Sequence, residues 1–160
     1  MSMISVTLPD GSINEYTTGI TAGEIVIDIE GRKHDCVAAM VDGEQKDFSA
    51  TLDSDCSVTG ISAFDDDGMY ILRHSAAHLL AQAITSLYPD AKPTIGPPVD
   101  RGFYYDFADL NDFGEADLKA VQKKMHELAR RNLTLERKEC TDTELEELFA
   151  SNPYKLEIIK

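Results

Sequence analysis

The sequence predicts an α+β protein in two parts, and three observations support this. Short alternating apolar segments separated by turn residues fill residues 1–62. After an acidic stretch that ends in Gly68, longer helical patterns take over. Residues 1–68 carry 3 basic and 14 acidic side chains, whereas residues 69–160 carry 12 and 15. We expect a first domain over residues 1–62, a linker over 63–68 and a second α+β domain over 69–160.

The first part predicts a hairpin, a helix, a second hairpin and a final strand. Pro-Asp-Gly and Asp-Gly turns separate the paired strands, and Thr21 with Glu24 forms a capping-box pattern at the start of the helix. The expected strands are 4–8, 13–17, 36–41, 44–48 and 57–61, and the expected helix is 21–29. This order of elements is that of a β-grasp domain.

The second part predicts helices joined by short strands. An apolar helix from residue 71 ends before Pro89, because proline disfavours helical geometry in the preceding residue. An amphipathic helix over 115–131 has an apolar stripe at 3-4-3 spacing, and His126 beside it is assigned a structural role. The remaining expected elements are a loop at 92–102, strands at 103–107, 133–140 and 154–159, and a capped helix at 141–150.

Composition limits the function classes. Of the 160 residues, 42% are hydrophobic and 28% charged, as in soluble globular proteins. No stretch approaches the length of a membrane span, and the N-terminus lacks the pattern of a signal peptide. Three distant cysteines fit reduced thiols better than a disulfide framework, so we expect a cytoplasmic protein with no membrane partner. The net charge of −14 makes strong phosphate binding by the acidic first part unfavourable.

His74 and His78 are the strongest candidate site residues. At i and i+4 they share one helix face, and imidazole transfers protons near neutral pH. Small residues, Ala81 and Thr85, fall close to that face and leave room for a ligand. Apolar residues cover much of the remaining cylinder, so we expect the helix to be buried.

A zinc-dependent hydrolase using His74 and His78 is one alternative. Zinc sites need three or four protein ligands, and the other candidates are His34, His126 and the separate cysteines. We assign no metal site, and a metal titration would discriminate between the two interpretations.

Four motifs resemble those of bacterial threonyl-tRNA synthetases. The opening TLPDGS (7–12) is similar to the start of their TGS domain, which is a β-grasp module. RHSAAHLL (73–80), IGPPVDRGFYYD (95–106) and KMHELA (124–129) resemble their editing domain. The histidine pair alone is a weak signal that alanyl-type editing domains share, but the 95–106 string after a TGS-like domain is specific.

The resemblance implies a role in hydrolysing tRNA mischarged with serine. It assigns His74, His78 and Lys155 as catalytic residues and Gly96 and Tyr105 as substrate-binding residues. The pocket of that family is completed by a C-x-x-x-H pair, which this sequence lacks. We therefore expect an N-terminal fragment that lacks the aminoacylation domain and has little editing activity alone.

The resemblance also implies partners and cofactors for the longer enzyme. The partners are threonine-specific tRNA, its serine ester and a second subunit of a homodimer. ATP, magnesium and a zinc ion in the catalytic domain are implied for the parent, and no cofactor for the fragment. TGS domains also occur in GTPases and stringent-response enzymes, so a regulatory binding module is the other alternative.

Overall fold

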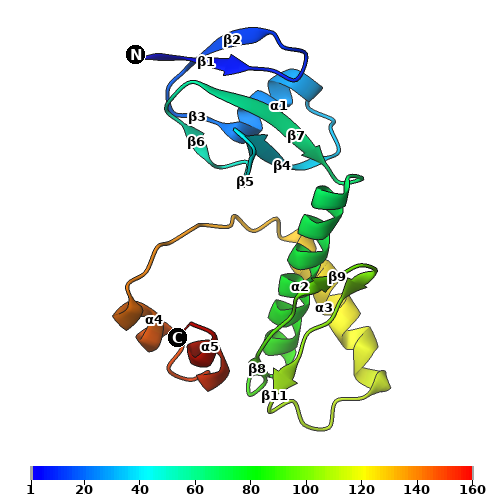
Figure 1. Ribbon diagram of the computed structural model, residues 1–160. Coiled ribbons are helices and arrows are strands. Elements are labelled where there is room, and N and C mark those ends of the chain that lie inside the picture. Colours follow the sequence, from blue (N-terminus) through cyan, green and yellow to red (C-terminus); the bar gives the residue numbers. More distant parts are fainter. Residues whose placement is uncertain (1, 160) are drawn as a thin grey trace. The chain divides into compact units, whose positions relative to one another are not determined.

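The computed structural model describes residues 2–159 and divides the chain into two compact units, one ending at Leu72 and one beginning at Arg73 (Figure 1). The mixed α+β class predicted from the sequence is confirmed. The division lies ten residues beyond the predicted end of the first domain, inside helix α2 (Asp66–Leu87).

The first unit is a five-stranded sheet covered by one helix. The sheet order is β2-β1-β7-β4-β5, with β1 and β7 parallel and the other neighbours antiparallel. A short β3–β6 ladder lies beside the helix. The elements are β1 (Met3–Thr7), β2 (Ile13–Thr17), β3 (Ile20–Thr21), α1 (Ala22–Glu30), β4 (Cys36–Val41), β5 (Glu44–Lys46), β6 (Thr51–Leu52) and β7 (Cys56–Ser62).

The predicted hairpins and capped helix of this unit are confirmed. Thr21 accepts a hydrogen bond from the Glu24 N–H, and the Glu24 carboxylate accepts one from the Thr21 N–H. Helix α1 then buries Ile25 and Val26 against the sheet. At the edge of the β1–β7 pair, Asp55 accepts a hydrogen bond from the Ser5 N–H at 2.7 Å.

The predicted linker is partly helical. Residues 66–68 form the first turn of α2, because the Asp65 carbonyl accepts the Met69 N–H. The acidic residues that suggested a linker therefore lie at a helix N-terminus, where the helix dipole favours negative charge. Gly68 is buried here, and a Cβ at this position would lie 1.8 Å from the Ser62 carbonyl oxygen.

The second unit packs helices and short ladders around a small core. Its core combines Ile84 of α2 with Val121 and Leu128 of α3 (Leu118–Arg130), and Figure 1 shows α3 running beside α2. Further elements are β8 (Lys92–Pro93), β9 (Pro98–Val99), β10 (Gly102–Phe103), β11 (Phe107–Ala108), η1 (Glu115–Asp117), α3 (Leu118–Arg130), α4 (Asp142–Leu148) and α5 (Pro153–Ile159).

Three predicted strands of this unit are wrong. The 103–107 strand is replaced by two separate ladders, β9–β10 and β8–β11. Residues 133–140 form no strand and lie exposed up to 139, since they have no strand to pair with among the described residues. Residues 154–159 belong to helix α5 because Pro153 occupies its first position, where proline is favourable.

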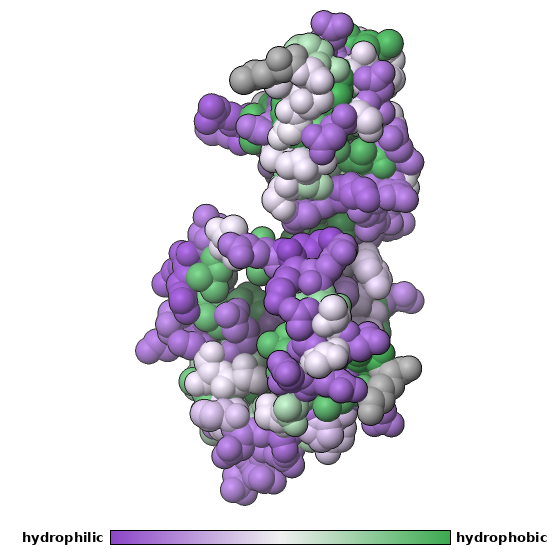
Figure 2. All heavy atoms as spheres, turned by 90° about the vertical axis from the view of Figure 1, so that its left-hand side faces the viewer, coloured by the Kyte–Doolittle hydropathy of each residue, from purple (hydrophilic) through white to green (hydrophobic). Residues whose placement is uncertain are grey.

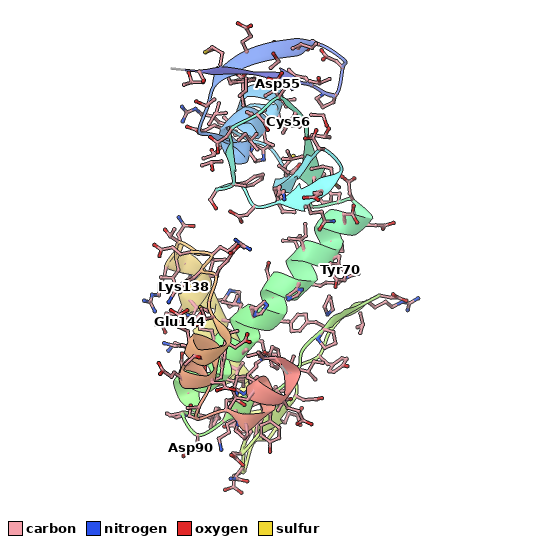
Figure 3. The ribbon with its side chains drawn as sticks, turned by 60° about the vertical axis from the view of Figure 1, so that its left-hand side comes forward. Asp55, Cys56, Tyr70, Asp90, Lys138 and Glu144 are labelled. Carbon is pink, nitrogen blue, oxygen red and sulfur yellow. The ribbon has the colours of Figure 1, made fainter. Side chains whose placement is uncertain are left out.

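The segment after α3 leads to a second capping box. Thr141 and Glu144 cap α4 reciprocally, as predicted, and Lys138 forms an ion pair with Glu144 at 3.4 Å (Figure 3). Leu135 is 86% exposed and Leu148 is 66% exposed. Figure 2 accordingly shows apolar surface among the hydrophilic atoms of this unit.

Candidate functional site

The two histidines lie one turn apart on the same face of α2. Their rings are stacked, with centroids 4.7 Å apart and planes inclined by 16°. The helix is less buried than predicted: its enclosed face consists of Ala77, Ala83 and Ile84, and both histidines are exposed residues. The small size of the two alanines explains how the helix packs closely on that side while the imidazoles remain accessible.

The environment of His78 favours its neutral form. Partial burial of the ring lowers the pKa of His78 below the ordinary 6.5, and the positive charges of His74 and Lys155 lower it further. The residue as a whole still reaches solvent. A neutral imidazole with a free lone pair can accept a proton at neutral pH.

Gly96 and Tyr105 face each other across two antiparallel segments. Backbone hydrogen bonds join Thr94 and Ile95 to Asp106, with N–O distances of 3.0 and 2.9 Å. A Cβ added to Gly96 would lie 2.1 Å from the Tyr105 ring, so glycine allows the aromatic ring to lie against the backbone. The contact between this segment and the Tyr105 ring therefore requires glycine at position 96.

Lys155 reaches Tyr105 from helix α5. Its Nζ lies 3.5 Å from the Tyr105 hydroxyl oxygen and 5.9 Å from the ring centroid. The Phe107 ring also stacks on Tyr105, with the ring centroids 4.9 Å apart and the planes inclined by 28°. Residues from three separate chain segments thus hold the tyrosine in one place.

The five candidate residues form two groups connected through Lys155. His74 and His78 form one, and Gly96, Tyr105 and Lys155 form the other, while the charge of Lys155 acts on His78. Beside His78, a cavity of about 750 Å³ lies between α2 and α3 and is lined by Ser75, His78, Leu79, Gln82, Leu128, Ala129, Asn132, Leu133, Thr134 and Leu135. Of the five candidate residues, only His78 is among those that line this cavity, and a neutral imidazole beside an open cavity suits the hydrolysis of a small ester.

The other candidate ligands lie elsewhere. His34 packs edge-on against Phe48 and accepts the Cys36 N–H at its Nδ1 within the first unit, whereas His126 is an exposed residue of α3. Within residues 2–159, no group of three or more His, Cys, Asp or Glu side chains is arranged to hold a metal ion. The histidine pair by itself supplies two of the three ligands that a zinc site requires.

Sequence reasoning missed Asn152. This residue precedes α5 and is buried, although asparagine is usually exposed. Asn before Pro is a pattern typical of a helix start, and this pattern could have indicated both α5 and the role of Asn152. The structure makes Asn152 part of the support of Lys155.

Comparisons with known proteins agree with the fold. Residues 4–60 match the TGS domain family. The chain is 42% identical over 161 aligned residues to threonine–tRNA ligases of Burkholderia multivorans and Burkholderia mallei, and 41% identical to that of Paraburkholderia phytofirmans. Each alignment covers 99% of this chain and 25% of the relative.

No helix within residues 2–159 is long and apolar enough to cross a membrane. The chain spans about a quarter of the length of the curated relatives it matches. Residues 4–60 thus match the TGS domain family, an α+β unit follows them, and 99% of the chain is similar to the N-terminal part of bacterial threonine–tRNA ligases.

Proposed function

We propose that this chain is the N-terminal part of a threonine–tRNA ligase and carries the residues that hydrolyse serine wrongly attached to threonine tRNA. The proposal rests on one observation above all. Lys155, which is distant in sequence from α2, contacts Tyr105 and acts electrostatically on His78. The similarity to threonine–tRNA ligases along the whole chain supports the choice of substrate.

A second site is needed because serine lacks only one methyl group of threonine. Binding discriminates one such group by only about 1–3 kcal/mol. A hydrolytic pocket that accepts serine and excludes threonine removes the remaining error. The Tyr105 ring lies against the backbone of Gly96, and we propose that this surface bounds the pocket on the side where the methyl group of threonine would lie.

The reaction is the attack of water on the ester carbonyl carbon. His78, held neutral, accepts a proton as the water oxygen bonds to that carbon. The tetrahedral intermediate then collapses, the bond to the ribose oxygen breaks, and the imidazolium returns the proton to that oxygen. Proton transfer of this kind typically contributes about 10²–10⁴-fold to the rate.

Lys155 stabilises the negative charge that develops on the carbonyl oxygen. Its ammonium group offers three donors, and Tyr105 fixes its position. His74 stacks on His78 and holds the orientation of that ring.

The longer protein carries the remaining functions of this proposal. They are aminoacylation with ATP and magnesium, a zinc ion in the catalytic domain, homodimer formation and a cytoplasmic location. The TGS unit, with 3 basic and 14 acidic residues in positions 1–68, contributes little to phosphate contacts.

Deacylation of seryl-tRNA by the longer enzyme tests the proposal. His74→Ala, His78→Ala and Lys155→Ala are expected to lose deacylation while aminoacylation, measured in parallel, is kept. Lys119→Ala, at an exposed position of α3, is the matched control and should retain both activities. Unchanged deacylation in all three variants would assign the chemistry to other residues.

A further inference from the structure

Asn152 uses both ends of its side-chain amide. Its Nδ2 donates to the Pro93 carbonyl at 2.9 Å, and its Oδ1 accepts from the Lys155 N–H at 3.3 Å. The residue is 9% exposed, so water competes little for these bonds. One neighbour is an acceptor and the other a donor, which fixes the amide orientation.

The two bonds connect the helix of Lys155 to the strands that carry the rest of the group. Pro93 of β8 pairs with Phe107 of β11, the residue on which Tyr105 stacks. Gly96 follows Pro93 by three positions. The Asn152 amide thus joins the start of α5 to strand β8, which immediately precedes the segment that holds Gly96 against Tyr105.

We propose that Asn152 is the positioning residue that holds Lys155 against Tyr105. The Lys155 N–H also donates to the Asn152 carbonyl at 3.1 Å, but that bond stays within the turn. The side-chain bond to Pro93 crosses to the neighbouring strand. A lysine side chain is long and flexible, so its ammonium group stays near Tyr105 only when the helix that carries it is fixed.

Two variants separate this role from simple helix capping. Asn152→Ser keeps an oxygen that can cap α5, but its side chain is too short to reach Pro93. Asn152→Asp keeps the shape and the acceptor, while its carboxylate cannot donate to the Pro93 carbonyl. Ser151→Ala, at an exposed neighbouring position, is the control that should change nothing. Lys155→Met removes the ammonium group and serves as the reference for complete loss of its charge near His78.

The test is NMR spectroscopy of the 160-residue chain. Wild type and Ser151→Ala should show a nuclear Overhauser contact between the Lys155 side chain and the Tyr105 ring. Asn152→Ser and Asn152→Asp should lose this contact. In both variants the pKa of His78 should rise, as it should in Lys155→Met, because the charge of Lys155 lowers it in wild type. If the serine variant fails to fold, the aspartate variant decides. A preserved contact with a wild-type pKa of His78 in a folded variant would overturn the proposal.

The catalytic consequence of this inference rests on the proposed function. In the longer enzyme, Asn152→Ser should slow deacylation of seryl-tRNA by about 10- to 100-fold, because small displacements of catalytic groups carry costs of that order. The change should fall on kcat more than on KM. A wild-type enzyme without deacylation would contradict the proposed function, whereas the NMR measurements of the contact and of the His78 pKa decide the positioning role of Asn152 without any tRNA.

Discussion

His74 and His78 stack their imidazole rings one helical turn apart, at a centroid distance of 4.7 Å. Protonation of both rings would place two positive charges in contact, close to the ammonium group of Lys155. The arrangement therefore resists the second proton and keeps a base available near neutral pH.

The pKa of His78 should lie below 6.5 in an NMR titration, because burial and the charges of His74 and Lys155 oppose the imidazolium form. Replacing His74 by Asn removes one charge and should raise the pKa of His78. Lys119→Met, at an exposed position of α3, should leave the pKa of His78 unchanged. A titration of His78 above 6.5 in wild type would contradict the described environment.

Protonation of His78 should destabilise the second unit. Its folded-state pKa is lower than the unfolded value, so the unfolded chain binds more protons between the two values. Stability should thus be complete above pH 6.5 and should fall as pH decreases through the folded pKa. Urea unfolding across this range, with His78→Gln as the reference, measures the effect. An equal slope in both proteins would exclude His78 as its source.

Gly96→Ala should destabilise the second unit by about 1–3 kcal/mol, the usual cost of overpacking. The new methyl group would lie 2.1 Å from the Tyr105 ring, and one of the two must move. Gly102→Ala is a matched control, since a Cβ there meets no atom within 4 Å. Amide exchange of α2 and α3 reports the change. Similar losses in both variants would show that backbone freedom, and not the ring, sets the cost.

Thr21→Ala should cost the first unit about 1 kcal/mol through loss of the helix cap. Thr141→Ala removes the same capping box from α4, which has no buried residue. We therefore expect only local fraying of α4, visible as faster exchange of its own amides. If Thr21→Ala likewise changed only the amide exchange of its own helix and left the core strands of the first unit unaffected, the assignment of α1 to that core would be contradicted.

The first unit could be predicted from the sequence almost completely. Alternating apolar residues, Asp-Gly turns and the Thr21 capping box are local signals, and the fold satisfies each of them locally. The strand predicted at 133–140 shows the limit of such signals. Alternation alone does not make a strand, because a strand needs a partner for its backbone hydrogen bonds, and these residues have none in the part of the chain described.

The candidate site could be predicted only in part. The helical spacing of His74 and His78 is a local property and places them on one face. The contact between Lys155 and Tyr105 joins positions 50 residues apart, so no periodicity reports it, and only the family resemblance indicated both residues. The helix at Pro153 was missed because apolar residues after it favoured a strand.

The most direct test of the account asks whether His78 and Lys155 act in one site. The measurement is single-turnover deacylation of seryl-tRNA by the longer enzyme carrying His78→Ala, Lys155→Ala or both. Residues that act as a unit have strongly non-additive effects, so the double variant should be about as slow as the slower single variant. Losses that multiply in the double variant, or single variants as fast as wild type, would contradict a shared site.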